Sequence, residues 1–421
     1  MMQAEQTLNH RILLLTTARS YRGSAFLQAA ERIGIEVIPV VDMSRELADY
    51  WHYPLGVNFN DPAAAIQTML DFHKQQPVQA ILGIDDSGSL LAARASERLG
   101  LPYNSPIAAE AARDKYMMRT LMAQGGVPCP IFRRFFTNTD PHLVAAQVTY
   151  PCVVKPLNLN GSRGVMRADH PAELVAAVQR LTQILQAEMP DGQPQPYLVE
   201  DFIPGFEVAL EGMLDGGQLT VLALFDKPDP LDGPFFEETI YVTPSRLPVA
   251  TQRAIADTVA LAARALGLQM GPVHAELRVN AQGPWMLEVA GRSIGGLCSQ
   301  VLRFGVDESL EELILRQACG LPQLSTEREQ RAAGVMMIPI PAAGILQRVE
   351  GVAAASAIPL IESVEITARV NYPITPLPEG ESYLGFIFAK GATAADVETA
   401  LRAAHGKLTF HILPELALKL V

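Results

Sequence analysis

Two glutamates near residue 280 carry the most informative chemistry of the chain. Glu276 lies in HAELRVN (274–280), Glu288 lies in WMLEVAG (285–291), and the turn signal NAQGP separates the two segments. This pattern predicts an antiparallel hairpin, and a turn centred on Gln282 places Glu276 opposite Glu288, with both side chains on one face. The apolar residues expected on the opposite face are Leu277, Val279, Leu287 and Val289.

Two carboxylates that face each other at about 5 Å repel unless a positive charge lies between them. A divalent metal ion is the natural candidate, because Mg²⁺ is commonly held by one or two carboxylates together with substrate phosphates. The alternative is that one of the two glutamates is simply solvated at the edge of a sheet. The hairpin therefore indicates a candidate metal site at Glu276 and Glu288.

Arg292 follows this hairpin in the glycine-bearing segment GRSIGG (291–296). Glycines allow backbone amides to approach an anion, and an arginine can bind a carboxylate or a phosphate with two hydrogen bonds. The alternative is an ordinary turn with a surface arginine. His274 opens the first strand of the hairpin, where a lone histidine is more often structural than catalytic.

A lysine and a glycine-bearing segment form the second candidate site. Lys155 directly follows the apolar run YPCVV, and KPLNLNGSRG (155–164) continues from it. This segment is either a surface loop or a mobile flap whose amides bind phosphate oxygens. The residues alone leave both alternatives open.

The elements that must position these groups begin with an alternation of strand and helix signals over the first hundred residues. Such alternation indicates a parallel sheet flanked by helices. The first strand-to-helix turn, TARSYRGS, lacks the pattern G-x-G-x-x-G, so we expect no dinucleotide there. The expected segments are RILLLTT (11–17), GSAFLQAAERIG (23–34), EVIPV (36–40), QAILGIDD (79–86) and SGSLLAARASERLGLP (87–102).

The remainder of the chain indicates a different arrangement. Two helical pieces lie in 104–130, and a smaller unit of strands around one helix follows. Strands return from residue 205, with a further helix at 251–266, and the last ninety residues mix short strands with one helix. The expected segments of the smaller unit are strands 131–136, 150–156 and 197–203, helix 171–188 and a polar loop at 188–196, and the final helix is 393–406.

Composition narrows the class of partner. The formal net charge of −12 argues against nucleic acid or an anionic membrane as the main partner, because both require a basic face. The four cysteines show no C-x-x-C pair, which excludes a disulfide framework or a zinc site of the usual spacing. We expect no signal peptide and no membrane span, and therefore a cytoplasmic protein.

In order and spacing, five segments resemble the ATP-grasp carboxylate–amine ligases, and most of all the branch of L-amino-acid ligases and carnosine-synthase-like enzymes. The resemblance covers nearly the whole chain and implies an α/β and α+β multidomain protein. The implied domains are a pre-ATP-grasp (Rossmann-like) domain at 1–110, an ATP-grasp domain at 111–325 with subdomains at about 128–203 and 204–325, and a C-terminal domain of the amino-acid-ligase type at 326–421. The five segments are 83–130, 150–165, 197–212, 286–296 and 334–412.

The resemblance also implies a role for each motif. Lys115 and Lys155 would hold the phosphates of ATP, Glu207 would bind the ribose, and Glu276 and Glu288 would bind Mg²⁺, with Mn²⁺ as an alternative ion. Arg292 would stabilise a carboxyl phosphate, with Lys155 and His274 as further candidate catalytic residues. The implied flap is Gly161, Ser162, Arg163 and Gly164, and the implied adenine-binding residues are Glu200, Asp201, Phe202 and Ile203.

One position departs from the superfamily pattern. Ala290 stands where an asparagine often follows the second metal glutamate, which leaves open whether one or two Mg²⁺ ions bind. The segment 225–248 resembles a loop near the acceptor substrate, with Lys227, Glu237 and Glu238 as candidate polar contacts.

The resemblance implies ATP-dependent formation of an amide or peptide bond between a carboxylate and an amine, above all of amino acids, through an acyl phosphate. Such chemistry requires mainly positioning and charge neutralisation. One alternative is a carboxylase that activates bicarbonate, or a ligase of purine biosynthesis; another is a nucleotide-binding regulatory protein without turnover. A homodimer is expected only because dimers are the commonest soluble oligomers.

Overall fold

A computed structural model describes residues 10–18, 20, 22–188 and 192–414. The ends of the predicted first and last domains, part of the first strand-to-helix turn and part of the predicted loop at 188–196 lie outside these residues. Among the described residues, no helix is both long and apolar enough to cross a membrane.

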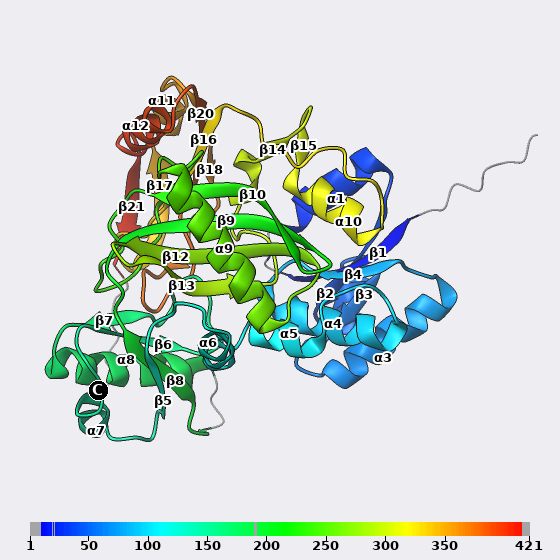
Figure 1. Cartoon of the computed structure of the whole chain (residues 1–421). Helices are drawn as coiled ribbons and strands as arrows, with labels where there is room; N and C mark the ends of the chain where they lie inside the picture. Colours follow the sequence, from blue (N-terminus) through cyan, green and yellow to red (C-terminus); the bar gives the residue numbers. More distant parts are fainter. Residues whose placement is uncertain (1–9, 19, 21, 189–191, 415–421) are drawn as a thin grey trace, which may run out of the picture.

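The N-terminal unit is the predicted parallel sheet flanked by helices (Figure 1). Its strand order is β3-β2-β1-β4. Leu13 and Leu15 of β1 enter the hydrophobic cluster on one face, whereas Ile12 and Leu14 enter the cluster on the other face. A strand buried on both faces explains the unbroken apolar run in the sequence. The bounds are β1 Arg11–Thr17, α1 Gly23–Ile33, β2 Glu36–Asp42, α2 Arg45–Tyr50, β3 Leu55–Val57, α3 Pro62–Gln75, β4 Ala80–Gly83 and α4 Asp86–Leu99.

A second unit contains a four-stranded antiparallel sheet of order β5-β8-β6-β7. Helix α8 packs its apolar face on this sheet, where Leu174, Val178 and Leu181 join the same buried cluster as Val154 of β6. The predicted helix at 171–188 is confirmed with the same ends. The bounds are α5 Pro106–Ala111, α6 Lys115–Gln124, β5 Phe132–Phe136, α7 Pro141–Ala145, β6 Cys152–Pro156, β7 Met166–Ala168, α8 Pro171–Glu188 and β8 Pro196–Asp201.

The largest sheet has eight strands in the order β13-β12-β9-β10-β11-β16-β20-β18. Helix α9 lies across one face of it, and Ile255, Val259 and Leu266 of this helix pack with Val273 and Leu277 of β12 (Figure 1). The bounds are β9 Phe206–Asp215, β10 Gln218–Lys227, β11 Ile240–Thr243, α9 Val249–Leu266, β12 Gly271–Asn280, β13 Gly283–Ala290, β16 Ala332–Ile338, β18 Ile361–Ile366 and β20 Gly385–Gly391.

The C-terminal segment continues this sheet rather than standing apart from it. Strand β11 pairs with β16, with Ile240 opposite Met336, so strands on both sides of residue 325 share one hydrogen-bonded sheet. Helix α12 covers part of that region through the cluster that contains Val397 and Leu401. The remaining bounds are η1 Cys298–Val301, β14 Arg303–Phe304, β15 Glu308–Ser309, α10 Leu310–Ala318, β17 Gly344–Glu350, α11 Val352–Ser356, β19 Pro373–Ile374, α12 Ala394–His405 and β21 Thr409–Leu413.

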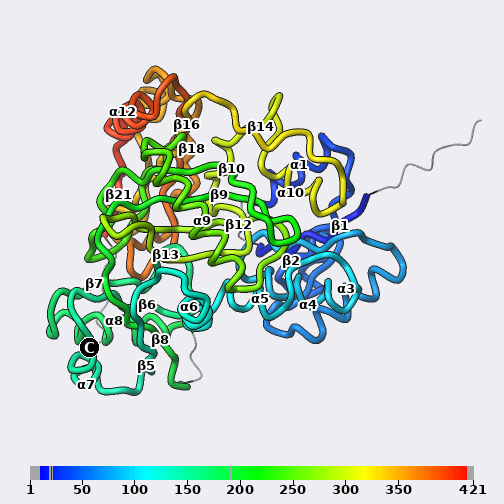
Figure 2. The backbone as a smooth tube through the Cα atoms, in the orientation of Figure 1, coloured from blue at the N-terminus to red at the C-terminus, as the bar shows by residue number. Residues whose placement is uncertain are grey.

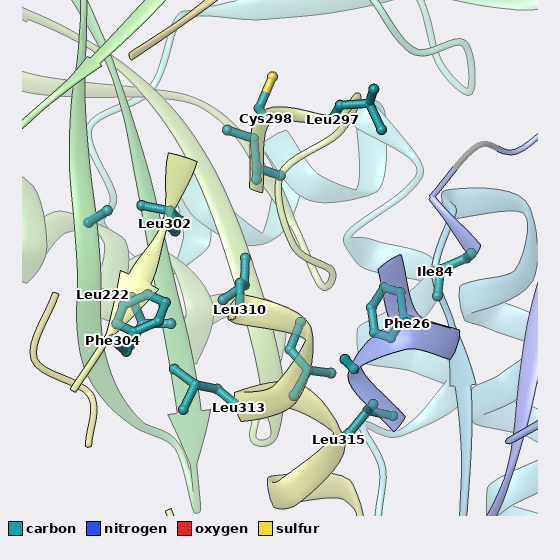
Figure 3. Packing of buried hydrophobic residues seen from close by; sticks show 14 of the residues in the cluster. Phe26, Ile84, Leu222, Leu297, Cys298, Leu302, Phe304, Leu310, Leu313 and Leu315 are labelled. Atoms are coloured by element: carbon teal, nitrogen blue, oxygen red, sulfur yellow. The ribbon is translucent and has the colours of Figure 1, made fainter. Parts of the chain in front are cut away.

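A shared hydrophobic core joins the N-terminal unit to the large sheet (Figure 3). Phe26 of α1, Leu313 of α10 and Leu222 of β10 belong to this one cluster, although the chain separates them by up to 287 positions. The tube in Figure 2 shows the blue N-terminal helix α1 beside the yellow helix α10. Because this core is apolar and continuous, the loops that both units contribute to the site are held in a fixed relation.

Candidate active site

The β12–β13 hairpin pairs the two glutamates as predicted. Glu276 lies directly opposite Glu288, and the strands are antiparallel. The path to this register differs from the prediction, because the turn is shorter and a bulge after Glu276 inserts Leu287 as an extra residue. The prediction that Leu287 lies beside Leu277 on the face away from the glutamates is therefore wrong. Met286 opposes Leu277 instead, and both of these side chains are fully buried.

Glu276 lies in a cluster of carboxylates around one buried lysine. The ammonium group of Lys227 is 3.5 Å from Glu276 Oε2 and 2.9 Å from Glu207 Oε1, and it also donates to Glu238. Each of the three carboxylates offers an oxygen within 4.8 Å of the other two, an arrangement that could hold a metal ion. Burial lowers the pKa of Lys227, but the surrounding carboxylates outweigh it and raise that pKa well above its usual value.

The pKa values of two of these carboxylates, Glu238 and Glu276, shift in opposite directions. Burial and the charge of Glu276 raise the pKa of Glu238 to about 7, against the attraction of Lys227. For Glu276, burial is outweighed by the positive charges of Lys227 and His274, and its pKa falls below the ordinary value. Glu276 is thus ionised over the physiological range and remains available to a cation.

Glu288 approaches a different lysine, at the first residue of α6. Lys115 Nζ lies 3.4 Å from Glu288 Oε1 and donates to the carbonyl of Leu159 at 3.1 Å. Asp114 caps the helix by accepting the backbone N–H of Met117 at 2.8 Å, which fixes where α6 begins and so where Lys115 lies. The segment after β6 and the hairpin therefore meet at this ammonium group.

Lys155 of β6 is held by the side chain of Glu200 on the adjacent strand β8. Glu200 receives two hydrogen bonds from Arg119, at 2.9 Å and 3.1 Å, and a contact from Lys155 Nζ. Burial would raise the pKa of Glu200, but the two cations lower it to about 2. The predicted adenine-binding residue Glu200 therefore uses its side chain to hold the predicted phosphate lysine.

The other residues of the predicted adenine site lie at the end of β8. The backbone N–H groups of Asp201 and Phe202 already donate to the carbonyls of Ile131 and Pro151, at 2.9 Å and 3.0 Å. The carbonyl of Ile203 accepts from Arg278 at 3.0 Å.

Glu207, the predicted ribose residue, accepts from Arg278 Nε at 3.1 Å as well as from Lys227. It is one of the three clustered carboxylates around Lys227, and only 7 % of the residue is exposed. The structure thus brings the predicted ribose residue to the same sheet face as Glu276.

The predicted flap bends through left-handed backbone and contacts the C-terminal segment. Gly161, Ser162 and Gly164 have φ angles of 59°, 56° and 72°. The backbone N–H of Gly164 donates to the carbonyl of Pro378 at 2.8 Å, and Arg163 Nε donates to the carbonyl of Glu379 at the same distance. The Arg163 side chain is therefore engaged by residues that the sequence analysis did not connect to the flap.

Arg292 and His274 each have a carboxylate partner from another strand or unit. Arg292 Nη2 lies 2.7 Å from Asp86 Oδ2, at the start of α4 in the N-terminal unit. His274 Nδ1 lies 3.1 Å from Glu211 Oε2, and its Nε2 lies 3.5 Å from Glu276 Oε1. Although burial lowers the pKa of His274, these carboxylates raise it to about 9, so the imidazole is protonated at neutral pH.

A pocket lies beside Arg292, between the N-terminal unit and the large sheet. Its walls come from α1, β4, the start of β12 and α10. Neither Lys115 nor Lys155 lines it. Arg292, whose guanidinium pairs with Asp86, is one of the residues that line this space.

Sequence reasoning missed four charged residues of the site. Arg119 lies one helical turn after Lys115, and this spacing of four could have marked it as a neighbour. Glu211 stands four residues after Glu207 in a strand whose intervening residues are apolar, and alternation places both glutamates on one face. Asp86 and Arg278 carry no comparable local signal, because their partners lie far along the chain.

Comparisons with known proteins place three family models on this chain. The ATP-grasp N-terminal domain matches residues 27–103, the ATP-grasp domain matches 148–301, and the L-amino acid ligase C-terminal domain 2 matches 336–412. The alanine–anticapsin ligase of Bacillus subtilis is 26% identical over 325 residues, covering 71% of this chain and 68% of that protein.

Solved structures agree with these matches. An L-amino acid ligase from Bacillus licheniformis superposes with a TM-score of 0.81 and 27% identity, covering 97% of this chain and 99% of that chain. The N5-carboxyaminoimidazole ribonucleotide synthetase of Thermotoga maritima has a TM-score of 0.69 at 15% identity, covering 96% and 100%, and is similar in fold alone.

Proposed function

Because the chain belongs to the ATP-grasp carboxylate–amine ligases, in the branch of the L-amino-acid ligases, we propose that it joins two amino acids through an amide bond at the expense of ATP. The observation that carries this proposal is the convergence of buried cations on the two paired glutamates. Lys115 approaches Glu288, and Lys227 approaches Glu276. The carboxylates of this array can hold a divalent cation, and the cation and the lysines together can neutralise a triphosphate and a reacting carboxylate.

The site residues fit ATP. Lys115 and Lys155 are largely buried, at 6% and 12% side-chain exposure, and they face Glu288 and Glu200, so both ammonium groups are held in fixed positions beside the hairpin and the predicted flap. We propose that they hold the phosphates and that Gly161–Gly164 closes over them, since left-handed backbone can turn successive N–H groups toward an anion. The backbone around Ile203 would receive the adenine, and Glu207 the ribose.

The donor set also fits Mg²⁺, with Mn²⁺ as an alternative ion. Carboxylate oxygens are the ligands that such hard cations prefer, and Glu276 and Glu288 lie opposite each other on one face. When bound, the ion would neutralise charge on the phosphates. Ala290 lies opposite His274 in the hairpin. Because its side chain is a methyl group, this position offers no side-chain oxygen to a second ion.

The proposed reaction has two steps. An oxygen of the first amino acid's carboxylate attacks the γ-phosphorus of ATP, and the bond to the β-phosphate oxygen breaks to release ADP. The amine of the second amino acid then attacks the carbonyl carbon of the acyl phosphate, loses a proton, and expels inorganic phosphate. Arg292 would stabilise the negative charge on the acyl phosphate, and the protonated His274 would hold Glu276 in place.

The alternatives are less well supported. A carboxylase or a purine ligase shares the fold, but the match of residues 336–412 is to a domain of L-amino acid ligases. Against a nucleotide-binding regulatory protein without turnover stands the retention of the whole set of groups, namely both lysines, both paired glutamates and Arg292. A homodimer and a cytoplasmic location stay predictions from the sequence.

The test is release of ADP by the purified protein with ATP and Mg²⁺ against pairs of amino acids. We expect turnover with particular pairs, and loss of turnover in Glu288→Gln, which keeps the shape of the side chain but removes its charge. A matched control is Glu362→Gln, on the exposed side of β18 away from the site. Turnover that requires bicarbonate, with amino acids inert, would contradict the proposal.

A further inference from the structure

A chain of three buried charges runs from helix α6 to the phosphate lysine. Arg119 of α6 binds both carboxylate oxygens of Glu200, through Nε at 2.9 Å and Nη2 at 3.1 Å. Glu200 Oε1 also contacts Lys155 Nζ. The side chains of Arg119 and Glu200 are 0% and 2% exposed, so water contributes little to the screening of these charges.

The arginine decides the net charge of this group. With Arg119, two positive charges and one negative charge leave a net charge of +1 beside the site. Without it, Glu200 and Lys155 would form a neutral pair, in which the ammonium group alone balances the charge of the carboxylate. The guanidinium also competes for Oε1, the oxygen that Lys155 contacts.

We propose that Arg119 is a positioning residue for ATP: by clamping and neutralising Glu200, it fixes Lys155 and leaves the positive charge of that lysine available to the phosphates. This inference rests on the proposed binding of ATP at Lys155. It assigns to Arg119 a role that acts through Glu200, because Nε and Nη2 of Arg119 both donate hydrogen bonds to the Glu200 carboxylate.

The geometry around Arg119 supports this role. Arg119 Nη1 is buried and has no hydrogen-bond partner among the described residues, so the guanidinium is not fully used in a structural network. Lys155 is paired in register with Leu198, and Glu200 with Val153, so the lysine and the glutamate lie on adjacent strands two positions apart. A shift of the Glu200 carboxylate would therefore move the ammonium group with it.

A purely structural role makes a different prediction. If Arg119 only anchors α6 to the sheet, removing Glu200 as well can restore no function. If Arg119 acts through charge, the double variant Arg119→Met/Glu200→Gln leaves Lys155 as the remaining charge of the group and restores the net charge of +1. The double variant also avoids a buried carboxylate that lacks its main partner, a change that is costly by itself.

The experiment measures the dissociation constant of ATP, with Mg²⁺, by isothermal titration calorimetry on the full chain. Thermal unfolding of each variant checks the fold, and Arg133→Met, at an exposed position of β5 in the same unit, is the matched control. We expect Arg119→Met to weaken ATP binding about tenfold to a hundredfold, the range for one charge-assisted interaction. The double variant should recover most of this loss of ATP affinity, and the affinity of Arg119→Met for adenosine, which has no phosphate, should stay unchanged.

Three results would overturn the inference while leaving the proposed function in place. The first is an Arg119→Met variant that binds ATP like the wild type, and the second is a double variant that binds ATP as weakly as Arg119→Met. The third is an equal loss of ATP and adenosine, which would indicate a general distortion of the site. If the wild-type protein itself fails to bind ATP while Arg133→Met and wild type unfold alike, the proposed function fails and this inference fails with it.

Discussion

Replacing His274 by glutamine should remove a stabilising interaction whose strength depends on pH. The buried imidazole lies between Glu211 and Glu276, at 3.1 Å and 3.5 Å. Its pKa rises from 6.5 to about 9 in the folded protein, because both carboxylates favour the charged form despite the opposing effect of burial. Glutamine keeps hydrogen-bonding groups but carries no charge.

The magnitude follows from the two pKa values. A difference of about 2.5 between the folded and unfolded pKa corresponds to about 3 kcal/mol of stabilisation. Because the folded-state pKa is the higher one, this stabilisation is fully present below about pH 6.5 and is lost as the pH rises through about 9. His274→Gln should therefore destabilise the protein most at pH 6 and least above pH 9.

The assay is the urea midpoint of unfolding at pH 6, 7.5 and 9.5 for the wild type and the variant. His170→Gln is the matched control, because His170 is exposed and its imidazole lies 3.3 Å from the Glu173 carboxylate. The gap between wild type and His274→Gln should narrow steadily with rising pH, whereas the control should stay close to the wild type. A gap that is constant or that widens toward pH 9.5 would refute the assigned charge on His274.

Three further predictions follow from contacts in the site and the core. Glu379→Ala removes the paired hydrogen bonds from Arg180 to the Glu379 carboxylate, at 2.6 Å and 2.9 Å, and should cost about 0.2–1 kcal/mol of global stability. Because the Glu379 carbonyl also accepts from Arg163 in the flap, trypsin should cut at Arg163 more quickly in this variant. An unchanged cleavage rate would count against the contact between the flap and the C-terminal segment. Asp86→Asn removes the charge that holds the Arg292 guanidinium in position. The KM for the carboxylate substrate should rise about tenfold in steady-state assays. An unchanged KM would show that Arg292 needs no carboxylate partner. Leu313→Ala leaves a cavity in the core of Figure 3 and should lower the free energy of unfolding by about 2–5 kcal/mol, measured by calorimetry or urea titration. A loss below about 1 kcal/mol would contradict the place of Leu313 in that core.

Much of the fold could be predicted because its signals are local. The parallel sheet of the first hundred residues, helix α8 and the β12–β13 hairpin each follow from the periodicity of apolar residues and from turn residues. The bulge at Leu287 was not predictable, because it depends on how β13 packs and not on the hairpin's own pattern. The continuation of the large sheet from β11 to β16 was also hidden, because β11 has four residues and pairs with a strand about ninety positions away.

The site was predictable in its residue types and less so in its contacts. Glu276 opposite Glu288 was predicted from a turn centred on Gln282, and the structure confirms that pairing, although it reaches it through a shorter turn and the bulge at Leu287. The partners Asp86 of Arg292 and Glu379 of Arg163 lie more than 200 positions from those residues, and no spacing rule reaches that far. The roles proposed for these residues are tested by the measurements of ATP binding and of turnover.

The most direct test of the account follows oxygen from the first substrate. An amino acid labelled with ¹⁸O in its carboxylate is incubated with the protein, ATP, Mg²⁺ and a second amino acid, and inorganic phosphate is examined by mass spectrometry. Activation of the carboxylate as an acyl phosphate predicts that one labelled oxygen enters inorganic phosphate for each amide bond formed, with ADP as the nucleotide product. Unlabelled phosphate, or AMP with pyrophosphate, would contradict it.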